Sequence, residues 1–136
     1  MVRKFWISLV AVFIVNMLLS FIEHGILLKD DYAALPFLMR SEQESQAFFG
    51  WMLLGQFMIC TAFVWVYQHG LEDKPWLPQG LHFGLVGAAF STIPHHLIYH
   101  AVAKFPTDLM IKQVVLDIPV MLCMGVVVAW VHRHKG

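Results

Sequence analysis

Four long apolar blocks dominate the sequence and limit what the chain can fold into. They cover residues 5–28, 47–68, 80–103 and 109–132, and short polar segments separate them. About 20 apolar residues in a helix cross the roughly 30 Å hydrocarbon core of a bilayer, so each block is long enough to span a membrane. Short connections make consecutive helices antiparallel neighbours. We therefore predict an all-α membrane protein, a single domain of residues 1–136 with four transmembrane helices in an up-down antiparallel bundle.

The composition agrees with a chain that lies mainly in lipid. Hydrophobic residues make up 59% of the sequence and charged residues only 13%, whereas about 25% of a soluble domain is charged. The formal net charge is zero, which gives no basic surface for nucleic acid. The two cysteines, Cys60 and Cys123, lie inside apolar blocks and form no Cys-x-x-Cys pair. We expect both to be small core residues, and the sequence leaves their redox state open.

The orientation follows from the positions of lysine and arginine. Five of these residues, including Lys135, flank the blocks on the side of the two termini, and four lie on the opposite side. Loops that carry more lysine and arginine stay in the cytoplasm. We therefore predict a multi-pass protein of the bacterial inner membrane with both termini in the cytoplasm.

Polar and ionisable side chains interrupt the apolar blocks. An aspartate at the middle of a membrane helix costs roughly 2.5–3.5 kcal/mol on insertion scales, so each such residue needs a partner or a function. In the first block the polar residues are three and four positions apart and share one helix face. Across all the blocks, the polar and ionisable residues of interest are Asn16, Ser20, Glu23 and His24 in the first, His95, His96 and His100 in the third, and Gln113 and Asp117 in the fourth.

The predicted topology brings these polar residues to one half of the bilayer. The first and third helices of an antiparallel arrangement end on the side where the fourth begins. Histidine and carboxylate are ligands for transition metals, and two histidines on separate helices could hold a haem. The predicted metal ligands are Glu23, His24, His95, His96, His100 and Asp117, and a polar network is predicted for Asn16, Ser20, Gln113 and Asp117.

Three interpretations of this cluster stay open. The side chains could satisfy one another structurally, bind a transition metal or haem, or relay protons, ions or a quinone. No spacing among them is a strong metal signature. The sequence has no glycine-rich phosphate loop and no Gly-x-Ser-x-Gly elbow, so we do not expect an enzyme. The leading hypothesis is a non-enzymatic accessory or assembly subunit of a larger membrane complex, or a homo-oligomer. The alternative is a metal- or haem-binding redox or transport protein.

A stripe of small residues begins the third block. Gly80, Gly84 and Ala88 are four positions apart and share a helix face. Small residues let two helix backbones approach closely inside a membrane. We predict a packing surface there, used either within the bundle or between subunits.

Six short runs carry a resemblance that covers nearly the whole chain. They are His24-Gly25-Ile26-Leu27-Leu28, Trp51-Met52-Leu53-Leu54, Phe63-Val64-Trp65-Val66-Tyr67, Lys74-Pro75-Trp76-Leu77-Pro78-Gln79-Gly80, Leu97-Ile98-Tyr99, and Lys112-Gln113 with Val127-Val128-Ala129-Trp130. Together they resemble a family of uncharacterised small bacterial integral membrane proteins. The resemblance implies four helices in the inner membrane and supplies no activity.

Overall fold

The computed structural model describes residues 1–133, and every regular element in this part of the chain is a helix. The predicted all-α class is therefore confirmed for this part of the chain. Two of the segments are π-helices that continue a neighbouring α-helix. In chain order the elements are α1 (Val2–Ser20), η1 (Phe21–Leu27), α2 (Lys29–Ala33), α3 (Glu42–His69), α4 (Trp76–Gly87), η2 (Ala88–Thr92), α5 (Ile93–Val102) and α6 (Thr107–His132).

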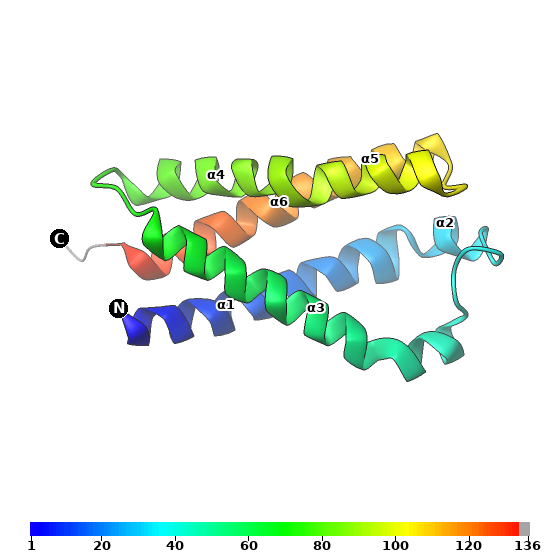
Figure 1. Cartoon of the computed structure of the whole chain (residues 1–136), viewed down its shortest axis with the longest axis horizontal. Coiled ribbons are helices and arrows are strands. Elements are labelled where there is room, and N and C mark those ends of the chain that lie inside the picture. The colour runs from blue at the N-terminus through cyan, green and yellow to red at the C-terminus, as the bar shows by residue number, and fades with distance from the viewer. Residues whose placement is uncertain (134–136) are drawn as a thin grey trace.

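The long helical segments alternate in direction (Figure 1). The N-terminus, the connection between α3 and α4 and the last turn of α6 lie at one end, on the left of the view. The short helix α2 and the connection between α5 and α6 lie at the other, which we name the α2 end. Lys135, which entered the orientation argument, lies outside the described residues.

Three helices are long and apolar enough to cross a membrane. They are Val2–Leu27, which combines α1 and η1, then Glu42–His69 and Thr107–His132. The predicted span at 80–103 is helical as α4, η2 and α5, but it is not among these three. Its four histidines, His82, His95, His96 and His100, make this segment less apolar than the other three.

The start of α3 differs from its predicted position at residue 47, because a capping box begins the helix at Glu42. The Ser41 hydroxyl accepts a hydrogen bond of 3.2 Å from the Glu44 backbone N–H, and the Glu44 carboxylate accepts one of 3.0 Å from the Ser41 N–H. These bonds satisfy backbone donors that the first turn of a helix leaves unpaired. The first turn of α3 is therefore polar and extends beyond the apolar block.

Helix α6 lies at the centre of the packing. It packs most closely against α4 and also contacts α1 and α5, whereas α3 contacts mainly α1. Aromatic side chains join α3 to α4 near the termini, where the ring centroids of Phe63 and Phe83 are 4.6 Å apart. Toward the α2 end, α3 diverges from α5 (Figure 1). The helices therefore pack tightly near the termini and open at the α2 end.

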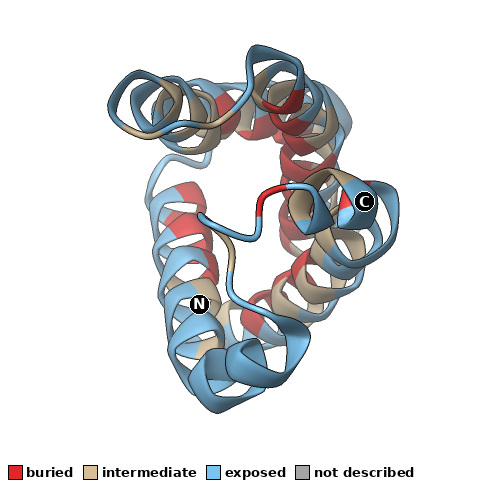
Figure 2. Cartoon of the chain, turned by 90° about the vertical axis from the view of Figure 1, so that its right-hand side faces the viewer, coloured by how far each residue is buried: buried red, intermediate tan, exposed pale blue. Residues whose placement is uncertain are grey.

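Buried residues line the inward faces of the helices, as Figure 2 shows. A large apolar cluster, which includes Val12, Val64 and Met124, fills the half near the termini. A smaller apolar cluster around Leu28 and Leu109 lies at the α2 end. Many outward side chains are large, apolar and exposed, as expected for surfaces that face lipid.

The stripe of small residues packs against α6 within the chain. A Cβ added at Gly84 would lie 2.5 Å from the Met121 carbonyl oxygen, and one at Gly80 would lie 2.6 Å from that of Gly125. Ala88 is fully buried. In the structure these small residues face α6 of the same chain. Because α6 of the same chain covers the stripe, the stripe is not available as a contact between subunits of a homo-oligomer.

Only one of the two cysteines is a core residue. Cys60 is buried on α3, whereas Cys123 is exposed on α6. The prediction for Cys123 was wrong because the buried face of α6 passes through Met121, Met124 and Gly125, and position 123 lies off that face.

We expect Gly84→Ala to destabilise the fold. The added methyl group has no room beside the α6 backbone, and overpacking of this kind costs about 1–3 kcal/mol. The matched control is Gly55→Ala on α3, where a Cβ would meet nothing within 4 Å. Alanine stabilises an open helix position by up to about 1 kcal/mol relative to glycine. Thermal unfolding in detergent measures both changes, and equal stability of the two variants would contradict the close α4–α6 contact.

Candidate metal centre

The π-helix η1 carries the most buried acid of the described chain. Glu23 is 2% exposed, although its neighbours Phe21 and Ile22 are exposed. Val12 and Asn16 precede it as buried positions of α1, a helix that packs against both α6 and α3. The backbone hydrogen bonds of a π-helix join residues five apart, whereas those of an α-helix join residues four apart. The extra residue in each bonded turn changes which side chains face inward. The carboxylate of Glu23 therefore points inward from a segment that is otherwise exposed.

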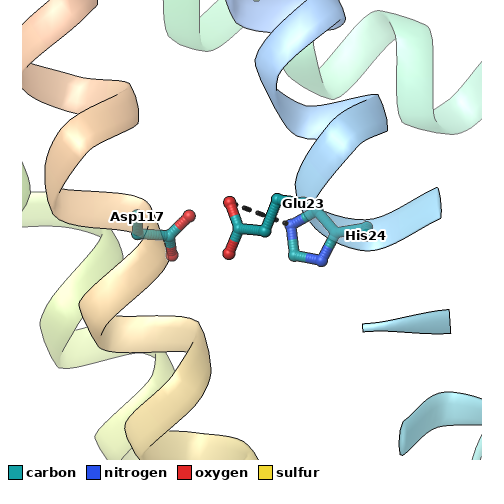
Figure 3. Close-up of side chains that lie close together, drawn as sticks. All are labelled: Glu23, His24 and Asp117. Atoms are coloured by element: carbon teal, nitrogen blue, oxygen red, sulfur yellow. Dashed lines mark ion pairs between the residues drawn. The ribbon is translucent and has the colours of Figure 1, made fainter. Parts of the chain in front are cut away.

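Glu23 faces Asp117 of α6 across the interior (Figure 3). One ligand atom each of Glu23, His24 and Asp117 lies within 4.8 Å of the others. We name these three residues the carboxylate cluster. Neither carboxylate oxygen of Glu23 has a hydrogen-bond partner among residues 1–133, and both oxygens are buried. A buried carboxylate without a donor or counter-charge is strongly unfavourable.

Asp117 differs from Glu23 because it has a partner. His96 of α5 hydrogen-bonds a carboxylate oxygen of Asp117 through its Nε2 atom, and both side chains are largely buried. Helix α5 thus contributes one histidine to the surroundings of the cluster. The pair fixes the position of the Asp117 carboxylate opposite Glu23.

His24 is held from the side of the α2 connection. Its Nδ1 atom shares a hydrogen bond of 2.6 Å with the Tyr32 hydroxyl, which also accepts one of 3.2 Å from the Gln113 amide. Its Nε2 atom lies 3.9 Å from a carboxylate oxygen of Glu23. Burial raises the pKa of Tyr32 to about 12, so its phenol is neutral and hydrogen-bonds as a hydroxyl. Tyr32 and Gln113 therefore orient the imidazole with Nε2 toward the carboxylates.

Two of the histidines expected at the site lie elsewhere. His95 is exposed on α5, and its ring packs on Tyr99 with centroids 4.5 Å apart. His100 hydrogen-bonds the Phe105 carbonyl oxygen over 2.8 Å through its Nδ1 atom. The structure thus brings together Glu23, His24, His96 and Asp117 and leaves these two histidines outside.

The predicted polar network divides into two parts. The amide of Asn16 donates a hydrogen bond of 2.7 Å to Gln56 of α3, and Ser20 donates one of 3.4 Å to Asn16. This part joins α1 to α3 and is separate from the carboxylate cluster. Asp117 is a member of the carboxylate cluster, and Gln113 is linked to it through Tyr32. The polar side chains of α1 therefore serve both helix pairing and the cluster.

Sequence reasoning missed Tyr32. The residue lies in a connection that was expected to be polar and exposed, and no periodicity marks it. Only the backward turn of α2 places its hydroxyl beside His24, eight residues earlier. The ion pair of 2.7 Å between Lys112 and Asp31 holds this connection against α6.

No protein-family model matches the chain, and no curated protein and no solved structure shows significant similarity to it. The resemblance to small bacterial membrane proteins therefore stays a prediction. Function has to be argued from the cluster itself.

We expect Asp117→Asn and Asp117→Leu to have opposite effects when a chelator is present. Asparagine still accepts a hydrogen bond from His96 and removes one of two facing negative charges, so stability should equal or exceed that of the unchanged chain. Leucine leaves His96 without an acceptor in a buried site, which costs about 1–3 kcal/mol. Thermal unfolding in detergent measures the difference, with Asp73→Asn in an exposed loop as control. A leucine variant as stable as the unchanged chain would show that His96 needs no acceptor.

Proposed function

We propose that this chain is a multi-pass inner-membrane protein that binds a cation at the carboxylate cluster, with both termini in the cytoplasm. Three helices long and apolar enough to cross a bilayer support the membrane part of the proposal. The cytoplasmic termini rest on the distribution of lysine and arginine.

The proposal includes a fourth crossing by α4, η2 and α5. Together they form a helical segment over residues 76–102. At 1.5 Å per residue it is roughly 40 Å long, which exceeds the hydrocarbon thickness. The segment runs beside α6 from one end of the molecule to the other (Figure 1). Of its polar residues, His96 bonds Asp117 of α6 and His100 bonds the Phe105 carbonyl oxygen at the α2 end.

Reporter fusions test the number of crossings. With four crossings, fusions at residues 40 and 104 report the same side of the membrane, and fusions at residue 73 and the C-terminus report the other. If 76–102 does not cross, residue 104 falls on the side of residue 73 and the C-terminus on the side of residue 40. That second pattern would contradict the four-span arrangement.

One observation carries the cation part of the proposal: both Glu23 oxygens are buried, face Asp117, and have no donor within residues 1–133. Two carboxylates that face each other in a medium of low dielectric repel strongly. A bound cation removes the repulsion and supplies the missing partner for Glu23. Ionisable groups at membrane depth usually mark such ion or proton sites.

The surroundings favour an ion over a haem. A haem held between helices needs two imidazoles with free ring nitrogens. The Nε2 atom of His96 is bonded to Asp117, so among residues 1–133 the cluster offers one free imidazole nitrogen, the Nε2 atom of His24, and not two. His95 and His100 lie outside the cluster. An accessory or assembly role for the protein is compatible with cation binding, but no particular surface supports it.

Added cations should raise the thermal stability of the chelator-treated protein in detergent. A ligand that binds only the folded state stabilises it by about 2.7 kcal/mol at one hundred times its dissociation constant. We expect at least one of Na⁺, K⁺, Mg²⁺, Ca²⁺, Mn²⁺ and Zn²⁺ to produce this gain, and Glu23→Gln to abolish it. The matched control is Glu72→Gln, because Glu72 is an exposed acid near the termini that pairs with Lys74. No gain with any cation, or an unchanged gain in Glu23→Gln, would contradict the proposal.

A further inference from the structure

We infer that the ion is a divalent transition metal ligated by Glu23, Asp117 and the Nε2 atom of His24. This inference rests on the proposed cation site. The inference concerns the chemical class of the ion. It depends on the donor atoms, the charge of the cluster and the way each donor is held.

The donor atoms combine carboxylate oxygen with imidazole nitrogen. Mg²⁺ and Ca²⁺ take oxygen ligands almost exclusively, whereas imidazole suits zinc, iron, copper and nickel. His24 directs its Nε2 atom toward the carboxylate of Glu23, 3.9 Å away. A site for a hard cation gains nothing from an imidazole in this position. The nitrogen therefore favours a transition metal.

The charge of the cluster favours a divalent ion. Glu23 and Asp117 contribute two negative charges when His24 and His96 are neutral. A monovalent cation would leave one charge uncompensated in a buried site, which is unfavourable at low dielectric. A divalent cation makes the site neutral.

Two of the three ligands already have an outer partner. His96 holds Asp117, and Tyr32 with Gln113 holds His24. Outer partners of this kind orient metal ligands and fix the histidine tautomer. For His24 to offer a lone pair at Nε2, its proton must lie at Nδ1, where the Tyr32 hydroxyl accepts it. Glu23 alone has no partner, so both of its oxygens are free for the ion.

The spacing of the ligands is slightly wider than coordination requires. Bonds of roughly 2.1 Å in a tetrahedral site place ligand atoms about 3.4 Å apart. The cluster's atoms lie within 4.8 Å of one another, so the widest pair has to approach by up to about 1.4 Å. Glu23 provides this movement because its flexible side chain is bonded to nothing else.

A cavity reaches one member of the cluster, His24. It has a volume of about 810 Å³ and lies between η1, the α2 connection and the start of α3. His24 and Tyr32 form part of its wall, and Glu42 and Glu44 lie on its other side. The His24 side chain is 41% exposed. A hydrated cation thus has a route to His24 from the α2 end, along a wall that carries Lys29 and Arg40 as well as the two acids.

Titration with Co²⁺ and Zn²⁺ tests the inference on the full chain in detergent, after removal of any affinity tag. Visible absorption of Co²⁺ reports nitrogen ligation, and competition by Zn²⁺ gives its affinity. We expect one equivalent per chain and a loss of affinity of more than about 100-fold in His24→Ala, which removes a ligand and not only an outer partner. Loss of an outer partner typically costs about 10–100-fold, so Tyr32→Phe should weaken binding less than loss of the ligand itself. The matched control is His95→Ala, an exposed histidine outside the cluster, which should bind as the unchanged chain does.

The outcomes separate this inference from the proposed function. Stabilisation by Na⁺, Ca²⁺ or Mg²⁺ without binding of Co²⁺ or Zn²⁺ would overturn the transition metal and leave the cation site standing. Unchanged affinity in His24→Ala, or equal losses in His24→Ala and His95→Ala, would also overturn it. If no cation binds at all, the proposed function itself fails. Circular dichroism of each variant confirms that the helices remain folded.

Discussion

The close backbone contact between α4 and α6 determines where much of the chain lies. Gly80, Gly84 and Gly125 leave no room for side chains between the two helices. Helices in lipid gain little from the hydrophobic effect against each other, so such van der Waals contact becomes a main source of association. Because α5 continues α4 through η2, the same contact sets His96 beside Asp117, about 12 Å before Gly125 on α6. Tight packing at one end thus positions the polar residues at the other.

The polar residues form a layer between two apolar clusters. Asn16 joins α1 to α3, and Tyr32 joins the α2 connection to η1 and α6. These side chains have partners, as buried polar groups normally do. Within residues 1–133 the exceptions are the two carboxylate oxygens of Glu23 in this layer and, near the termini, the Nε2 atom of His132. A residue that violates a general packing rule at an otherwise consistent site is where function is expected.

Much of the fold and part of the site could be predicted from the sequence. The apolar blocks predicted the helices. The alternating directions of these helices predicted that Glu23, His24, His96 and Asp117 lie in one region. The exclusion of His95 could not be predicted, because η2 and the following proline change the phase of the helix just before it. Tyr32 could not be found either, because the backward turn of its connection depends on tertiary contacts and leaves no periodic signal.

The two π-helices give this region mechanical compliance. An i→i+5 bond can exchange for an i→i+4 bond through small changes in backbone torsion angles, which turns the adjoining residues by up to ~100° and moves them along the axis. Segment η1 contains Glu23 and His24, and η2 immediately precedes the helix that carries His96. Both segments are therefore places where the backbone can adjust locally within longer α-helical segments. The spacing of the polar groups can change while the glycine contact between α4 and α6 stays in place.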